Sequence, residues 1–170
     1  MLVKIIIIGD THLNSFKKLP KEMAQAIKEG DWIIHVGDYT SIDTVEGLIR
    51  WKGDKFKGVF GNADPLSIRK ILPDKVILEI KGKKIGITHP FYGGPETFIK
   101  ARVKREFKDY DVDAIVFGHT HEPEIIEVNK ILLINPGKGY LEKNSFGTPT
   151  SFAILTVSET LQAEIINIAL

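Results

Sequence analysis

The chain begins MLVKIIIIGDTH (residues 1–12), and this stretch decides the fold class. Leu2 to Ile8 form an apolar run, interrupted only by Lys4, that is too continuous for a strand with one face in water. The run therefore predicts a strand buried on both faces, as in a parallel sheet covered by helices. Polar residues follow it at once, with Asp10 and His12 behind a glycine. A polar cluster is thus expected at the carboxyl end of this strand.

The rest of the chain divides into an α/β beginning and a β-rich ending. Apolar spacing predicts helices over 18–29 and 41–51 and strands over 32–36 and 57–60, an order that implies a parallel sheet with right-handed crossovers. A hairpin around the KGK turn, a helix and further short strands follow, over residues 76–88, 96–107, 114–117, 124–128, 131–134, 150–157 and 161–168. We expect one α/β domain over residues 1–170, with two mixed β-sheets packed as a sandwich and helices outside.

Composition narrows the functional classes. The 170 residues are 43% hydrophobic and 26% charged with a net charge of +1, whereas dedicated nucleic-acid binders usually carry a basic excess. Cysteine is absent, so disulfides and thiolate metal ligands are excluded. The isoleucine run is too short for a signal peptide or a membrane span. We therefore expect a cytoplasmic protein that is not bound to a membrane.

Polar residues gather where apolar strands end. All five histidines lie in or just after such strands, and ligands of open α/β sheets sit at the carboxyl ends of parallel strands. One edge of the fold is therefore expected to carry Asp10, His12, Asp38, Asn62, His89, His119 and His121. Residues i and i+2 of an extended chain point the same way, so Asp-x-His and His-x-His can each act as a pair.

These side chains predict a metal site. Imidazole, carboxylate and amide oxygen without sulfur suit Mn, Fe, Zn, Co or Ni better than a closed structural zinc site. The set is too large for one ion and suits two, at the separation of about 3.5–4 Å used to hydrolyse phosphate esters. Each residue alone has a plainer interpretation, since Asp10 and Asp38 are also good loop starters. His35 lies inside its strand, and we expect it to support the ligands or to be a hydrogen-bonded core histidine.

The ordered motifs resemble those of the calcineurin-like metallophosphoesterase superfamily. They are GDTH (9–12), GD (37–38), GNAD (61–64), TH (88–89) and GHTH (118–121), and they span most of the chain. The short length and the NPG at 135–137 are similar to the small bacterial and archaeal phosphodiesterase branch, to which the retromer subunit Vps29 is structurally related. The resemblance implies an αββα sandwich.

The resemblance also implies a role for each motif residue. Asp10, His12 and His121 would hold one metal, Asp38 would bridge both ions, and Asn62, His89 and His119 would complete the second site. Catalysis would involve Asp38, Asn62 and His119 through a metal-bridging hydroxide and the phosphate. The cofactors would be two divalent transition metal ions, with Mn expected first and Ni, Fe, Zn or Co as alternatives.

One departure from the family pattern bears on the substrate. Many larger relatives have a histidine where this chain has Ala63, and small relatives often have cysteine. Alanine cannot donate a proton, and Asp64 is expected to order the turn rather than to replace the missing acid. Lys138 stands where serine is frequent and is expected to be solvated, with a phosphate contact as the alternative. Gly93, Gly94 and Pro95 are expected to cap a helix, or else to offer N–H groups to a phosphate.

The sequence therefore predicts a metal-dependent phosphodiesterase acting on a small phosphodiester, in a homodimer or homotetramer. Three alternatives stay open. They are a phosphomonoesterase on the same metals, a non-catalytic protein-binding scaffold like Vps29, and a nuclease or cyclic-nucleotide phosphodiesterase. No substrate-binding residue is identified from the sequence, and the natural substrate and the native metal are left open.

Overall fold

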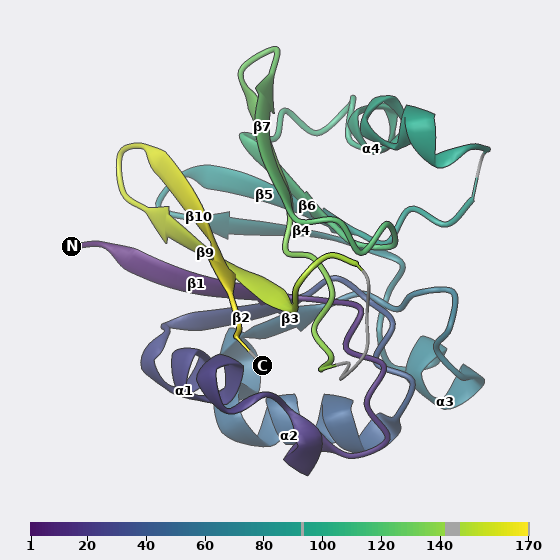
Figure 1. The fold of residues 1–170 in the computed structure, drawn as a ribbon. Helices are drawn as coiled ribbons and strands as arrows, with labels where there is room; N and C mark the ends of the chain where they lie inside the picture. Colours follow the sequence, from purple (N-terminus) through teal and green to yellow (C-terminus); the bar gives the residue numbers. More distant parts are fainter. Residues whose placement is uncertain (93, 142–146, 170) are drawn as a thin grey trace.

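The computed structural model describes residues 1–92, 94–141 and 147–169. Two five-stranded sheets face each other, and helices cover their outer surfaces (Figure 1). This arrangement confirms the predicted α/β sandwich of two mixed sheets flanked by helices. Within the described ranges, no helix is long and apolar enough to cross a membrane.

The first sheet has the strand order β10-β9-β1-β2-β3. Its strands are β1 (Val3–Ile8), β2 (Trp32–His35), β3 (Phe56–Gly58), β9 (Ser151–Val157) and β10 (Leu161–Asn167). β1, β2 and β3 run parallel, whereas β9 is antiparallel to β1 and to β10. Helices α1 (Lys21–Glu29) and α2 (Ile42–Lys52) pack on its outer face through buried side chains such as Met23, Ile27 and Leu48.

The second sheet has the order β4-β5-β6-β8-β7. Its strands are β4 (Lys75–Ile80), β5 (Lys83–Thr88), β6 (Ala114–Phe117), β7 (Glu124–Val128) and β8 (Ile131–Asn135). The β4–β5 hairpin closes through Lys81 and Gly82, whose φ angles of 53° and 75° are those of a tight hairpin turn. Helix α4 (Ile99–Glu106) covers the outer face through Ile99 and Val103 (Figure 1).

The isoleucine run explains why β1 is central. Ile5 and Ile7 point between the sheets, and Ile6 and Ile8 point toward the helices, so every member of the run is fully buried. Burial of each such side chain stabilises the fold by about 1.5–3 kcal/mol relative to exposure. Because β1 lies between β2 and β9, the first polar residues of the chain emerge at the middle of one end of the sandwich.

The structure differs from the sequence prediction at several helices. Helix α1 begins at Lys21 because Pro20 occupies the position before its first turn, and a short 3₁₀ helix, η1 (Phe16–Lys18), precedes it. Another 3₁₀ turn, η2 (Gly53–Lys55), follows α2. The helix predicted over 96–107 divides into η3 (Glu96–Phe98) and α4, and Phe98 is 62% exposed. Helix α3 (Leu66–Arg69) was not predicted because four residues are too few to show a periodic pattern.

Candidate metal centre

The polar residues predicted from the sequence converge at one end of the sandwich. They lie just beyond β1, β2 and β3 of the first sheet and β5 and β6 of the second. Asp10, Asp38 and His89 are buried, whereas His12 and Asn62 are exposed. Buried carboxylates thus lie beneath more accessible imidazole and amide groups.

The side chains of the first motif meet those of the last. Nε2 of His121 lies 3.3 Å from Oδ1 of Asp10, and the backbone N–H of His119 donates to Oδ2 of the same carboxylate at 3.1 Å. Interaction with Asp10 raises the pKa of His121 above its ordinary value. Residues more than 100 positions apart in the chain therefore form one half of the site.

Asp38 lies between the two halves. Its Oδ2 is 3.6 Å from Nε2 of His12 and 3.5 Å from Nε2 of His89. Oδ1 of Asn62 is 3.1 Å from Nε2 of His89 and 3.0 Å from Nδ1 of His119. The structure therefore brings together all of the residues predicted for the site, with the Asp38 carboxylate near histidines of both halves.

The backbone at these positions is not extended, contrary to the expectation from the i, i+2 spacing. Asp10, His12, His119 and His121 have φ angles of 46°, 43°, 86° and 63°, and Asp38 has 60°. Residues with a Cβ seldom adopt this left-handed conformation, and it concentrates at functional sites. The motif side chains are therefore directed by sharply turned loops beyond the strand ends rather than by the alternation of a strand.

Glycines allow these loops to approach each other. A Cβ on Gly61 would lie 2.1 Å from Oδ1 of Asp38, and a Cβ on Gly118 would lie 2.8 Å from Oδ2 of Asp10. Both distances are shorter than a non-bonded contact allows. Glycine is therefore required where the chain passes the two buried carboxylates.

The donor set fits divalent cations. One potential ligand atom from each of Asp10, His12 and His121 lies within 4.8 Å of the others, and the same holds for Asp10, Asp38 and His89. Oδ1 of Asp10 is buried and has Nε2 of His121 at 3.3 Å, but it accepts no hydrogen bond of normal geometry from the described residues. A buried carboxylate oxygen without a donor is costly unless a cation compensates it. The chemistry of these groups suits a transition metal ion.

Asp64 connects two of the loops. Its Oδ2 accepts from the backbone N–H groups of Asp38 at 2.9 Å and Gly61 at 2.7 Å, and its Oδ1 accepts from that of Thr40 at 2.8 Å. Burial raises the pKa of this carboxyl above its ordinary value. Because both oxygens are occupied by backbone donors, Asp64 orders the turn, as expected from the sequence. The backbone N–H of Ala63 donates to Oδ1 of Asp38 at 2.8 Å.

His35 supports the site from behind. Its Nδ1 accepts from the backbone N–H of Gly37 at 3.1 Å, so its Nε2 carries the proton and donates to Oγ1 of Thr11 at 2.9 Å. The ring stacks on Tyr39 at 3.6 Å between centroids, and burial lowers its pKa well below the ordinary value. Neutral His35 therefore links the loop of Asp10 and His12 to the loop of Asp38.

Three further residues depart from the sequence prediction or were missed by it. Lys138 is only 5% exposed, with Nζ 5.0 Å from the ring centroid of Tyr140, so it is not the solvated lysine that we expected. The hydroxyl of Tyr140 lies 3.4 Å from Nδ1 of His121. Arg69 donates to the carbonyl groups of Asn62 and Asp64 at 2.8 Å each. Arg69 was missed because it lies on helix α3, which the sequence pattern did not predict.

The predicted role of Gly93, Gly94 and Pro95, as a helix cap or as N–H donors to a phosphate, involves Gly93, which lies outside the described residues.

Comparison with known proteins identifies the family. The family model for the calcineurin-like phosphoesterase superfamily domain matches residues 3–160. The chain belongs to this superfamily. A protein of Methanocaldococcus jannaschii named "Probable metallophosphoesterase" is 34% identical over 163 residues, which cover 95% of this chain and 80% of that protein. The family predicted from the sequence motifs is therefore confirmed.

Two further comparisons follow, one with a protein named for its activity and one with a solved structure that shows the fold. A protein of the same organism named as a phosphodiesterase is 29% identical over 162 residues, covering 87% of this chain and 90% of the relative. The structure of vacuolar protein sorting 29 (Vps29) from Cryptosporidium parvum superposes with a TM-score of 0.74 at 20% identity, covering 99% of this chain and 98% of the other. The calcineurin-like superfamily consists of phosphoesterases that depend on divalent metals, and this chain is a member of it.

Proposed function

We propose that this phosphoesterase is a dinuclear metal-dependent phosphodiesterase. The observation that carries the proposal is the pair of buried carboxylates, Asp10 and Asp38, approached by histidines from three loops. One buried oxygen of Asp10 accepts no hydrogen bond among the described residues and has only the ion-pair contact with His121 at 3.3 Å. In this proposal one cation is held by Asp10, His12 and His121, and the other by Asn62, His89 and His119. Asp38 is shared between them.

Two divalent cations in such a site lower the pKa of water and offset negative charge on phosphoryl oxygens. The surrounding residues orient the ligands and the substrate. Nδ1 of His89 lies 2.7 Å from the carbonyl oxygen of Val36, which fixes the imidazole so that its Nε2 faces Asp38 and Asn62. The N–H of Ala63 holds one oxygen of Asp38 and leaves the other to the histidines.

The preference for a diester is argued from the missing acid. Ala63 has no titratable group, and the oxygens of neighbouring Asp64 are occupied by backbone N–H donors. A positioned general acid contributes about 10²–10⁴-fold. Its absence favours small phosphodiesters with good leaving groups. The name of the phosphodiesterase relative supports the same choice.

The test combines metal analysis with matched substrates. Protein loaded with Mn²⁺ is assayed on bis(p-nitrophenyl) phosphate and on p-nitrophenyl phosphate, which share one leaving group, and the other candidate metals, Ni, Fe, Zn and Co, are compared. We expect two metals per chain and faster hydrolysis of the diester. Faster hydrolysis of the monoester would instead establish a phosphomonoesterase. A protein that takes up no metal and hydrolyses neither substrate would favour a Vps29-like scaffold.

Substitutions test the roles proposed for individual residues of the site. Asp38→Asn and His119→Ala should lose metal-dependent activity while keeping the fold, measured by circular dichroism. Full activity in metal-loaded Asp38→Asn would refute the shared position of this carboxylate. Ala63→His should raise activity on the monoester relative to the diester, and an unchanged ratio would contradict the missing-acid argument. Light scattering tests the homodimer or homotetramer that belongs to the same proposal.

A further inference from the structure

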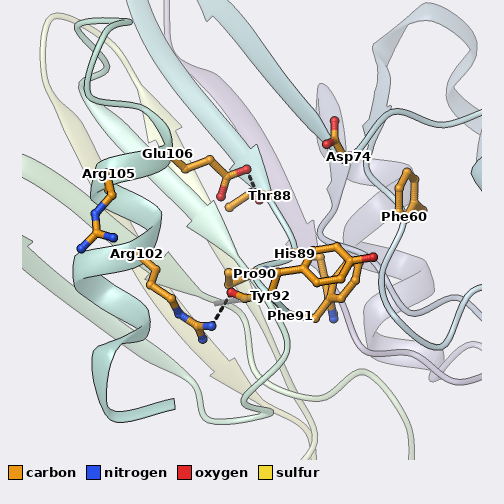
Figure 2. A pocket seen from close by; sticks show the side chains of 10 residues that line it. All are labelled: Phe60, Asp74, Thr88, His89, Pro90, Phe91, Tyr92, Arg102, Arg105 and Glu106. Carbon is orange, nitrogen blue, oxygen red and sulfur yellow. Dashed lines mark hydrogen bonds between the residues drawn. The ribbon is translucent and has the colours of Figure 1, made fainter. Parts of the chain in front are cut away.

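A cavity of about 490 Å³ lies directly beside the second half of the candidate metal centre. Figure 2 shows it between the loop that follows β5, helix α4 and the region of Phe60 and Asp74. Its volume is within the range of about 300–1,000 Å³ typical of small-molecule pockets. The sequence indicated no substrate-binding residue, because these segments are distant along the chain.

His89 joins the cavity to the site. His89 is one of the residues that line the cavity, and its buried side chain places Nε2 3.5 Å from Oδ2 of Asp38 and 3.1 Å from Oδ1 of Asn62. A phosphoryl group bound among these residues would have one of its two organic groups next to the cavity entrance. This inference rests on the proposed function, because it concerns the substrate of the same site.

The cavity wall combines aromatic rings with the charged side chains of Asp74, Arg102, Arg105 and Glu106. Phe60, Phe91 and Tyr92 contribute to its wall. The rings of Phe91 and Tyr92 lie 4.0 Å apart between centroids, and Phe91 lies 6.0 Å from the imidazole of His89. Tyr92 is 75% exposed, so its ring is accessible to a ligand. Planar aromatic groups stack on such rings with favourable geometry.

The loop that bears these rings is held in place. The guanidinium of Arg102 on α4 donates a hydrogen bond to the backbone carbonyl of Tyr92 (Figure 2). At the base of the same loop, Thr88 donates to Glu106 on α4 at 2.8 Å. Two contacts with one helix therefore fix both ends of the 88–92 segment before any ligand binds, which lowers the entropy cost of binding.

A second cavity beside the metal centre offers a different environment. A cavity of about 400 Å³ beside His12 is lined by Leu13, Asn14, Lys18, Tyr140 and Leu141. Only one of these residues, Tyr140, is aromatic. One cavity lies beside His89 and the other beside His12, and their linings differ in chemistry, so the two cavities can distinguish the two organic groups of a diester.

We propose that the cavity beside His89 binds a planar aromatic group of the substrate, so that the enzyme acts on aryl or heteroaryl phosphodiesters. Phe60, Phe91 and Tyr92 select this group, and Arg102 positions the loop that carries two of the rings. The cavity beside His12 accommodates the other, non-aromatic group.

Phosphonate monoesters test this proposal without hydrolysis. The monomethyl esters of phenyl-, cyclohexyl- and methylphosphonate carry the single negative charge of a diester and differ only in one group. Their binding to Mn²⁺-loaded protein is measured by calorimetry. We expect the phenyl compound to bind roughly tenfold more tightly than the methyl compound, the low end of what one ring stacked on aromatic side chains provides, and more tightly than the cyclohexyl compound.

Substitutions test which residues cause the preference for the phenyl compound. Phe91→Ala and the more exposed Tyr92→Ala should each reduce the phenyl-to-methyl ratio severalfold while methyl binding is retained, which reports an intact metal centre. Leu141→Ala in the cavity beside His12 is the control and should leave the ratio unchanged. The proposal is overturned if the phenyl group gives no advantage, if no phosphonate binds, or if Leu141→Ala lowers the ratio as much as the ring variants. Phenyl preference in a protein that hydrolyses no diester would refute the proposed activity but not the cavity assignment.

Discussion

Asp64→Asn tests whether one buried carboxylate holds the loops of the metal centre together. The native side chain accepts three backbone N–H groups, two at Oδ2 and one at Oδ1. Asparagine is nearly identical in shape but keeps one acceptor oxygen and replaces the other with an NH₂ donor. If its oxygen takes the place of Oδ2, the amide faces the N–H of Thr40, and donor opposes donor.

The expected cost follows from this geometry. A buried donor left without an acceptor costs about 1–3 kcal/mol, and hydrogen bonds to a charged group contribute more than neutral ones. The remaining bonds to Asp38 and Gly61 lose their charge assistance. The sum is a loss of about 2–5 kcal/mol in the free energy of unfolding, or on the order of 10 °C in Tm for a chain of this size. Because Asp38 and Asn62 both lie on the connected loops, metal affinity should fall as well.

Thermal and denaturant unfolding of metal-free protein measure the stability, and calorimetric titration with Mn²⁺ measures the affinity. Asp109→Asn is the matched control, since it removes the same charge from an exposed carboxylate in the turn after α4. We expect that control to stay within about 0.5 kcal/mol of the native protein. A stability and a metal affinity of Asp64→Asn that both equal those of the control would refute the reasoning.

Four other perturbations have defined outcomes. His35→Leu leaves the N–H of Gly37 and the hydroxyl of Thr11 without their partner, so stability should fall by about 2–4 kcal/mol and calorimetry should show weaker Mn²⁺ binding; unchanged binding would contradict the supporting role. Gly61→Ala places a Cβ 2.1 Å from Oδ1 of Asp38, and elemental analysis should find less metal per chain. Gly53→Ala adds a Cβ at a glycine with φ 52° and nothing within 4 Å, so it introduces backbone strain without a clash and should keep its metal. Phe107→Ala should destabilise the protein by about 3–5 kcal/mol in urea unfolding because the ring is 2% exposed and packs under α4. Asp43 accepts from the N–H of Phe16 and the hydroxyl of Ser15, and its pKa is lowered chiefly by the backbone bond. Its stabilising effect is present above the ordinary carboxyl pKa and is lost as the pH falls through the lowered one. Asp43→Asn should therefore destabilise the protein at pH 7, and the difference in Tm should shrink as the pH is lowered below the ordinary carboxyl pKa.

Much of the site was predictable because strand ends can be recognised in the sequence. Continuous apolar runs such as Ile5–Ile8 mark the buried strands, and the first polar residues after each run mark the edge where parallel strands end. This reasoning identified Asp10, Asp38 and His89 without knowledge of any contact between them. The distances that bring them together agree with that expectation.

The sequence by itself determined the layered fold, the position of β1 between helices and the facing sheet, and the edge at which the polar residues meet. Periodicity carries this information because burial acts on every residue of a strand or helix. Only the tertiary structure decided how the site is held together. The left-handed loops, the Asp64 and His35 contacts, the buried Lys138 and the aromatic cavity beside His89 all depend on residues far apart in the chain. Each such contact joins residues that are distant in the chain and produces no repeating pattern in the sequence, so local sequence analysis cannot predict it.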